Sequence, residues 1–110
     1  MAPLRIRRSR AKGSRLTADN GLPIVVVSRP SKWGNPFSEA LAGATRADKP
    51  AVRAASVDRF RHALLAGSLP FTQADVRAEL RGKNLACWCP LDQPCHADVL
   101  LHVANARRGR

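Results

Sequence analysis

The chain has 110 residues, with 19 lysines and arginines against 8 acidic residues and a formal net charge of +11 at pH 7. A chain of this length accommodates one small domain, and the absence of an apolar run of about 20 residues excludes a membrane-spanning helix. Three cysteines cannot all pair, so we expect free thiols, as a reducing compartment keeps them. The basic start has no apolar stretch behind it, so we expect no signal sequence and a cytoplasmic protein without a membrane partner.

The positive charge is concentrated at the two ends of the chain. Nine of the 19 basic residues lie in segments 5–15 and 107–110, whereas residues 16–106 are nearly neutral. Such basic ends either hold nucleic-acid phosphates through counterion release or keep a small protein in solution. The candidate nucleic-acid contacts in the first segment are Arg5, Arg7, Arg8, Arg10 and Lys12.

Two strands and a loop are predicted in the first third of the chain. Leu4 and Ile6 alternate with arginines, which predicts a short edge strand with one charged face. The β-branched run "IVVVS", residues 24–28, predicts a strand buried on both faces, as in parallel sheets. The prolines, glycine and asparagine of "RPSKWGNPF", residues 29–37, predict a loop directly after this strand.

Two helices are predicted next. Apolar spacing predicts the first from Ala51 to the glycine at position 67. The second begins at Thr72, which forms a capping-box pattern with Asp75, and ends near Gly82.

A buried strand and a last helix complete the pattern. "NLACW", residues 84–88, predicts the strand, and residues 95–106 predict a helix with Val99, Leu100 and Val103 facing inward. This order of elements predicts a single α/β domain, a small Rossmann-like layered sheet with flanking helices.

All three cysteines lie within the 13 residues "ACWCPLDQPCHAD", positions 86–98. In an extended strand Cys87 and Cys89 face the same side. Cys95 and His96 are predicted in the first turn of the last helix, where free amides and the helix dipole favour negative charge. We therefore expect Cys95 to be the most accessible and most reactive of the thiols.

This cysteine stretch fits three kinds of site. Zinc would have suitable ligands, but the usual two-residue spacer is missing and the adjacent Cys95 and His96 would have to turn onto one ion. We therefore expect no stoichiometric zinc and no other cofactor. The cysteines could instead be small apolar residues of a core. The third kind is a ligand pocket at the carboxyl end of the strand, where open α/β sheets place their sites.

A phosphorylated ligand suits such a pocket. If the strands at 24–28 and 84–88 are parallel neighbours, loop 29–37 meets the cysteine stretch and brings cationic groups and an indole. The other interpretation is a rigid turn with Trp33 and Phe37 in the core. The candidate ligand-binding residues are Arg29, Ser31, Lys32, Trp33, Asn35, Cys87 and Cys89, and the candidate catalytic residues are Cys95, His96 and Asp98.

Three segments resemble the domain-of-unknown-function family 4326, found in bacteria and their phages: "RIRRSRAKG", "RPSKWGNPF" and "LRGKNLACWCPLDQPCHADVLL". The likeness covers nearly the whole chain, although Ser14 stands where the family often has a tryptophan. It implies that the basic segment belongs to the domain, and it assigns no activity. A looser similarity to uncharacterised Rossmann-like domains with a Cys-His pair at a strand-to-helix turn implies the same fold.

The sequence thus predicts a domain that binds a nucleotide or a nucleic-acid end between loop 29–37 and the cysteine stretch. The alternative is a non-catalytic nucleic-acid-binding accessory protein whose arginine-rich ends make the contacts. Its Cys/His cluster would then be structural, with or without zinc. A third alternative is a structural or interaction module.

Overall fold

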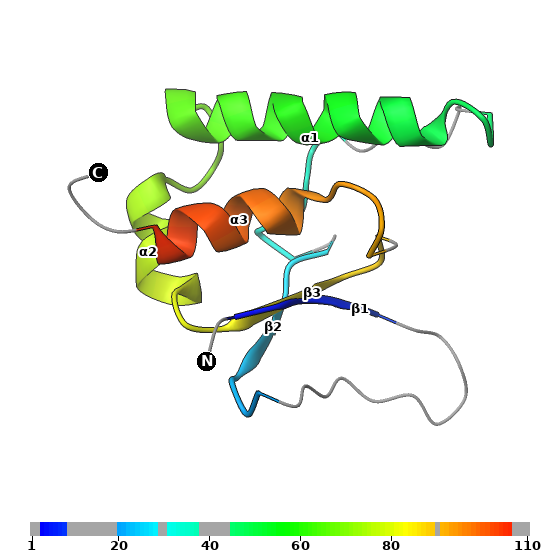
Figure 1. Cartoon of the computed structure of the whole chain (residues 1–110). Coiled ribbons are helices and arrows are strands. Elements are labelled where there is room, and N and C mark those ends of the chain that lie inside the picture. The colour runs from blue at the N-terminus through cyan, green and yellow to red at the C-terminus, as the bar shows by residue number, and fades with distance from the viewer. Residues whose placement is uncertain (1–2, 9–19, 29–30, 38–44, 90, 107–110) are drawn as a thin grey trace.

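Three short strands form one parallel sheet: β1 (Arg5–Arg7), β2 (Ile24–Val26) and β3 (Asn84–Cys87). β3 lies between the other two (Figure 1). Because all three strands run in one direction, their carboxyl ends meet at one edge of the sheet. The computed structural model describes residues 3–8, 20–28, 31–37, 45–89 and 91–106.

The central position of β3 explains the burial of the strands. All four of its residues are buried, whereas the three residues of β2 are only half-buried. The prediction that residues 24–28 form a strand buried on both faces is therefore wrong in extent and in burial. Within the described residues β2 pairs on one side only, and the chain after it buries Val27 and Ser28.

The helices are α1 (Lys49–Ala66), α2 (Gln73–Leu80) and α3 (His96–Asn105). α1 ends at Gly67, whose φ of 75° suits glycine. The predicted capping box of α2 is confirmed, because Thr72 and Asp75 each accept a hydrogen bond from the other's backbone amide. None of the described helices is long and apolar enough to cross a membrane.

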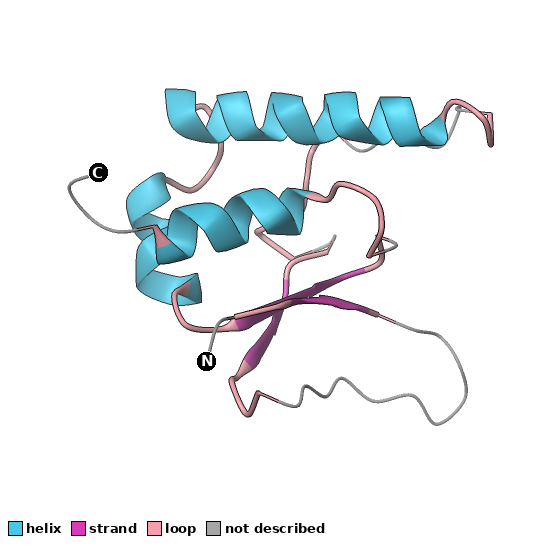
Figure 2. Cartoon of the chain, in the orientation of Figure 1, coloured by secondary structure: helices cyan, strands magenta, loops and turns pink. Residues whose placement is uncertain are grey.

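The helices lie against the sheet in layers. α3 lies between the sheet and α1, as Figures 1 and 2 show. The ring of Phe60 in α1 lies 5.3 Å from the ring of His96 in α3, so the two helices share one core. Leu100 and Val103 of α3 are buried as predicted, while Val99 is only partly buried. These observations confirm an α/β arrangement with a small parallel sheet.

The burial of α3 leads to a stability prediction. Leu100 is completely buried, whereas Leu91, in the turn before α3, is 59% exposed. Leu100→Ala should lower the free energy of unfolding by about 2 to 5 kcal/mol, because it leaves a cavity in the core. Leu91→Ala is the matched control and should change it by less than about 0.5 kcal/mol. Urea unfolding measures both, and equal losses would contradict this packing of α3.

Candidate functional site

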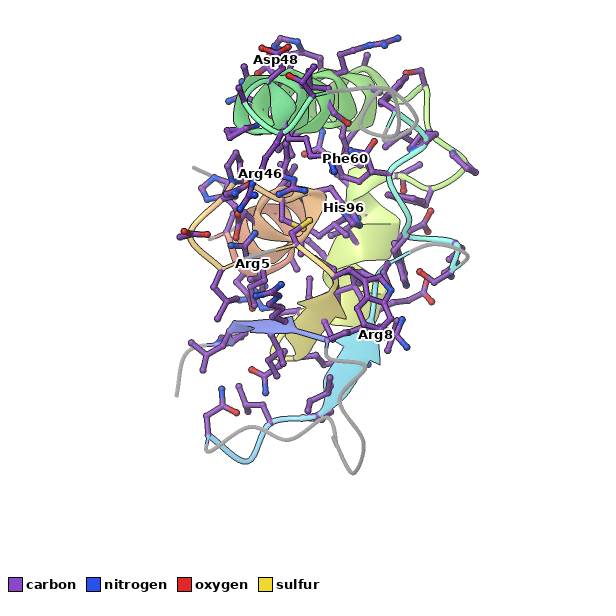
Figure 3. The ribbon with its side chains drawn as sticks, turned by 90° about the vertical axis from the view of Figure 1, so that its right-hand side faces the viewer. Arg5, Arg8, Arg46, Asp48, Phe60 and His96 are labelled. Carbon is purple, nitrogen blue, oxygen red and sulfur yellow. The ribbon has the colours of Figure 1, made fainter. Side chains whose placement is uncertain are left out.

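The three thiols lie together at the carboxyl edge of the sheet. The sulfur atoms of Cys87, Cys89 and Cys95 all lie within 4.8 Å of one another. Cys87 Sγ and Cys95 Sγ are 2.7 Å apart, and all three cysteines are free. The cluster forms because the chain leaves β3, turns, and enters α3 directly above the strand end (Figure 3). We refer to these three residues as the thiol cluster.

The strand geometry expected from the sequence holds at the end of β3. Cys87 and Cys89 bring their sulfur atoms to the same place, and the backbone amide of Cys89 donates to Cys87 Sγ at 3.4 Å. Trp88, between them, lies beneath the Arg8 guanidinium, whose carbon is 4.3 Å from the ring centroid.

His96 extends the thiol cluster with one nitrogen. Its Nδ1 lies 3.7 Å from Cys95 Sγ, and its Nε2 lies 2.8 Å from the carbonyl oxygen of Val27. A carbonyl only accepts, so Nε2 carries the hydrogen and Nδ1 keeps a lone pair on the side of the sulfur. Burial lowers the pKa of His96, which keeps the imidazole neutral at neutral pH.

Hydrogen bonding within the thiol cluster shifts the pKa values of the three cysteines in different directions. Bonds from the Cys87 and Cys95 thiols lower the pKa of Cys89, and the Arg53 guanidinium lowers it further. Hydrogen bonding to Cys89 raises the pKa of Cys87 to about 11. Hydrogen bonds to Cys87 and Cys89, together with burial, raise the pKa of Cys95. These shifts favour Cys89 as the first of the three thiols to lose its proton.

Asp98 and Arg5 hold the start of α3 against β1. Asp98 Oδ2 accepts the backbone amide of Cys95 at 3.2 Å and lies 3.2 Å from Arg5 Nη1. Arg5 also donates to the carbonyl of Leu91 at 2.7 Å, and its side chain is only 9% exposed. The Arg5 side chain is thus engaged by the start of α3, which leaves little of it exposed for the phosphate contact expected from the sequence.

Two residues of the loop after β2 lie in the core. Trp33 is 4% exposed, and its ring centroid lies 4.8 Å from that of Phe71. The enclosed indole therefore leaves little surface for the ligand that the sequence interpretation assigned to it. Asn35 is also buried, and its amide donates to Ser56 Oγ in α1 at 2.9 Å. These contacts confirm the rigid-turn interpretation for this part of the loop.

The remaining loop residues are divided between surface and interior. Lys32 is exposed and forms an ion pair with Glu79 at 2.8 Å. Ser31 Oγ is buried and has no hydrogen-bond partner within the described ranges. The predicted contacts Arg29, Arg10 and Lys12 lie outside the described residues.

The predicted order of thiol exposure is reversed. Cys95 is completely buried, because it precedes α3 with an extended backbone instead of standing in the first turn. Cys89 is only partly buried, so it is the most exposed of the three. The sequence pattern also gave no signal for Arg53, whose partly buried side chain approaches Cys89 from α1 and donates to Gln93 Oε1.

The irregular spacing of the cysteines along the sequence does not prevent their sulfur atoms from lying together. Cys95 has φ −148° and ψ 148°, whereas His96 begins the helix. With this change of backbone conformation the adjacent Cys95 Sγ and His96 Nδ1 lie 3.7 Å apart, an approach that the sequence interpretation treated as an obstacle to a shared zinc ion. The connection between β3 and α3 brings the cysteines together, although the usual two-residue spacer between paired ligands is absent.

Comparison with known proteins confirms the resemblance. The family model described as "Domain of unknown function (DUF4326)" matches residues 6–106. No curated protein and no solved structure matches the chain. The function must therefore be inferred from the geometry of the site.

The exposure of the thiols predicts the order of their alkylation. In metal-free native protein, iodoacetamide should modify Cys89 first, because Cys87 and Cys95 are 1% and 0% exposed. Peptide mapping by mass spectrometry measures the order. Labelling of Cys95 before Cys89, or equal labelling of all three, would contradict the placement of these side chains.

Proposed function

Because the chain belongs to the DUF4326 family, whose description assigns no function, we propose from its geometry that it is a zinc-binding module. One observation carries the proposal: three free cysteine sulfurs lie within 4.8 Å of one another at one edge of the sheet. Thiolate sulfur and imidazole nitrogen are the ligands that Zn²⁺ prefers in closed structural sites. The proposed ligands are Cys87, Cys89, Cys95 and, by Nδ1, His96.

Two of the distances can be compared directly with those of a tetrahedral zinc site. Zinc bonds of about 2.3 Å to sulfur and 2.05 Å to nitrogen place a sulfur and a nitrogen ligand roughly 3.6 Å apart. Cys95 Sγ and His96 Nδ1 are 3.7 Å apart. Two sulfur ligands lie roughly 3.8 Å apart, so Cys87 and Cys95 would separate by about 1 Å from their 2.7 Å.

The surroundings of His96 and Cys89 support this ligand set. The bond from Nε2 to the Val27 carbonyl fixes the ring and leaves Nδ1 for the metal, as ligating histidines require. Three thiolates around Zn²⁺ leave one net negative charge, and the Arg53 guanidinium lies close enough to Cys89 to lower its pKa. Four protein ligands fill a tetrahedral site, so the proposed role of the metal is structural.

A structural zinc ion favours a non-catalytic domain. It would join the end of β3 to the start of α3 and hold the carboxyl edge of a Rossmann-like sheet rigid. Asp98 then acts as a helix cap, and Cys95 and His96 as ligands instead of catalytic groups. A cytoplasmic location fits, because a reducing compartment keeps thiols available for metal.

Nucleic-acid contact is the second candidate function, and the exposed side chain of Arg7 on β1 favours it. Together with a formal charge of +11, this side chain offers phosphates an accessible cation. The interpretation of loop 29–37 as a pocket for a nucleotide has less support, because Trp33 and Asn35 are internal.

Metal analysis of the purified protein tests the zinc proposal. Inductively coupled plasma mass spectrometry should find one zinc ion per chain. Replacement by Co²⁺ should give the visible absorption and sulfur-to-metal charge transfer of a tetrahedral thiolate site. Cys89→Ser and His96→Gln should lower zinc affinity, while His102→Gln, on the exposed face of the same helix, should leave it unchanged.

Two results would contradict zinc binding. One is a well-folded protein that carries no zinc and takes up no Co²⁺ after purification under reducing conditions. The other is bound metal that survives replacement of all three cysteines by serine. Equal effects of His96→Gln and His102→Gln on zinc affinity would contradict the role of His96 as a ligand and would leave the three thiolates as the proposed site.

A further inference from the structure

Arg8 crosses the carboxyl edge of the sheet, on the side away from Arg5 (Figure 3). Its backbone amide donates to the carbonyl of Cys87 at the end of β3 at 2.7 Å. Its guanidinium then passes over the Trp88 ring and donates from Nη1 to Ser28 Oγ, beyond the end of β2, at 3.0 Å. One cation thus spans the ends of all three strands.

The guanidinium of Arg8 retains unused donor capacity. A guanidinium has five N–H donors, and within the described residues one of them is used, by Ser28. No carboxylate of the described ranges lies within ion-pair distance of it, whereas the neighbouring Arg5 is paired with Asp98. A partly buried cation without a carboxylate favours an anionic ligand.

Two serines, Ser28 and Ser31, follow β2 and lie close to each other. Ser28 is 5% exposed and accepts from Arg8. The backbone amide of Ser31 donates to the carbonyl of Ser28 at 3.0 Å. Ser31 Oγ is buried without a hydrogen-bond partner in the described part of the chain. A buried hydroxyl with no bond is costly unless a ligand supplies one.

We infer that Arg8, Ser28 and Ser31 form an anion site for a terminal phosphate group, of the kind a phosphate monoester carries. Guanidinium forks and hydroxyl donors match the oxygens of phosphate, and the carboxyl edge of a parallel sheet is where open α/β domains bind ligands. The site shares no residue with the thiol cluster, so it is independent of zinc. Phosphate binding at this site also differs from nonspecific attraction of anions by the basic ends of the chain, because it depends on Arg8 in particular.

Titration with inorganic phosphate at constant ionic strength tests the site. Amide and arginine Nε–H signals in ¹H–¹⁵N spectra should shift saturably at Arg8, Ser28 and Ser31. Arg8→Gln should weaken binding about ten- to a hundredfold, the cost of a charge-assisted hydrogen bond. Arg81→Gln removes the same charge from an exposed position between α2 and the start of β3, at the other edge of the sheet, and should change affinity by less than about twofold.

Ser31→Ala keeps the test decisive if Arg8→Gln does not fold. The Ser31 hydroxyl makes no hydrogen bond in the described residues, so its loss should not lower stability and should weaken phosphate binding by about two- to tenfold. Equal effects of Arg81→Gln and Ser31→Ala on phosphate affinity, or shifts that do not saturate, would overturn the site.

A second pair of probes distinguishes the source of the phosphate. A short oligonucleotide with a 5′-phosphate and the same oligonucleotide with a 5′-hydroxyl are compared at matched salt. Tighter binding of the phosphorylated form, lost in Ser31→Ala, supports the site and identifies a nucleic-acid end as a ligand. Equal binding of the two forms together with saturable inorganic phosphate supports the site for a free phosphate group. Equal binding without a phosphate response contradicts it.

Discussion

The central position of β3 determines where every candidate functional group lies. Because β1 and β2 both pair with β3 in parallel, the chain leaves all three strands at one edge. Cys87 and Cys89 at the end of β3, the serines that follow β2 and the arginine that follows β1 are therefore neighbours. α3 begins at this edge and returns over the sheet, which adds Cys95 and His96. If β3 were displaced, the thiol cluster and the Arg8 contacts would both be lost.

Charge balance explains why this edge offers one site for a cation and another for an anion. On one side the buried Arg5 is neutralised by Asp98, which also caps α3. In the middle, thiol sulfur and a neutral imidazole offer a site for a cation, with Arg53 nearby. On the other side Arg8 has no carboxylate among the described residues, so it offers a site for an anion. A metal and a phosphate can thus be held by the same strand ends without competing for ligands.

Local signals made much of the fold predictable from the sequence. The end of α1 at Gly67 and the capping box at Thr72 depend on neighbouring residues only, and the structure confirms both. The thiol cluster and the enclosed Trp33 depend on contacts between distant segments, which spacing does not encode. The ion pair of Arg5 was not predictable because an arginine in a basic run looks solvated, and the carboxylate that pairs with it lies 93 positions away in the chain.

The coordination shell of the metal is the most direct test of a zinc centre at this edge. Zinc K-edge X-ray absorption of the purified, reduced protein reports ligand types and distances without any substitution. The thiol cluster and His96 predict three sulfur ligands at about 2.3 Å and one nitrogen at about 2.05 Å. A shell of oxygen and nitrogen alone, or a protein without zinc, would contradict the proposed centre.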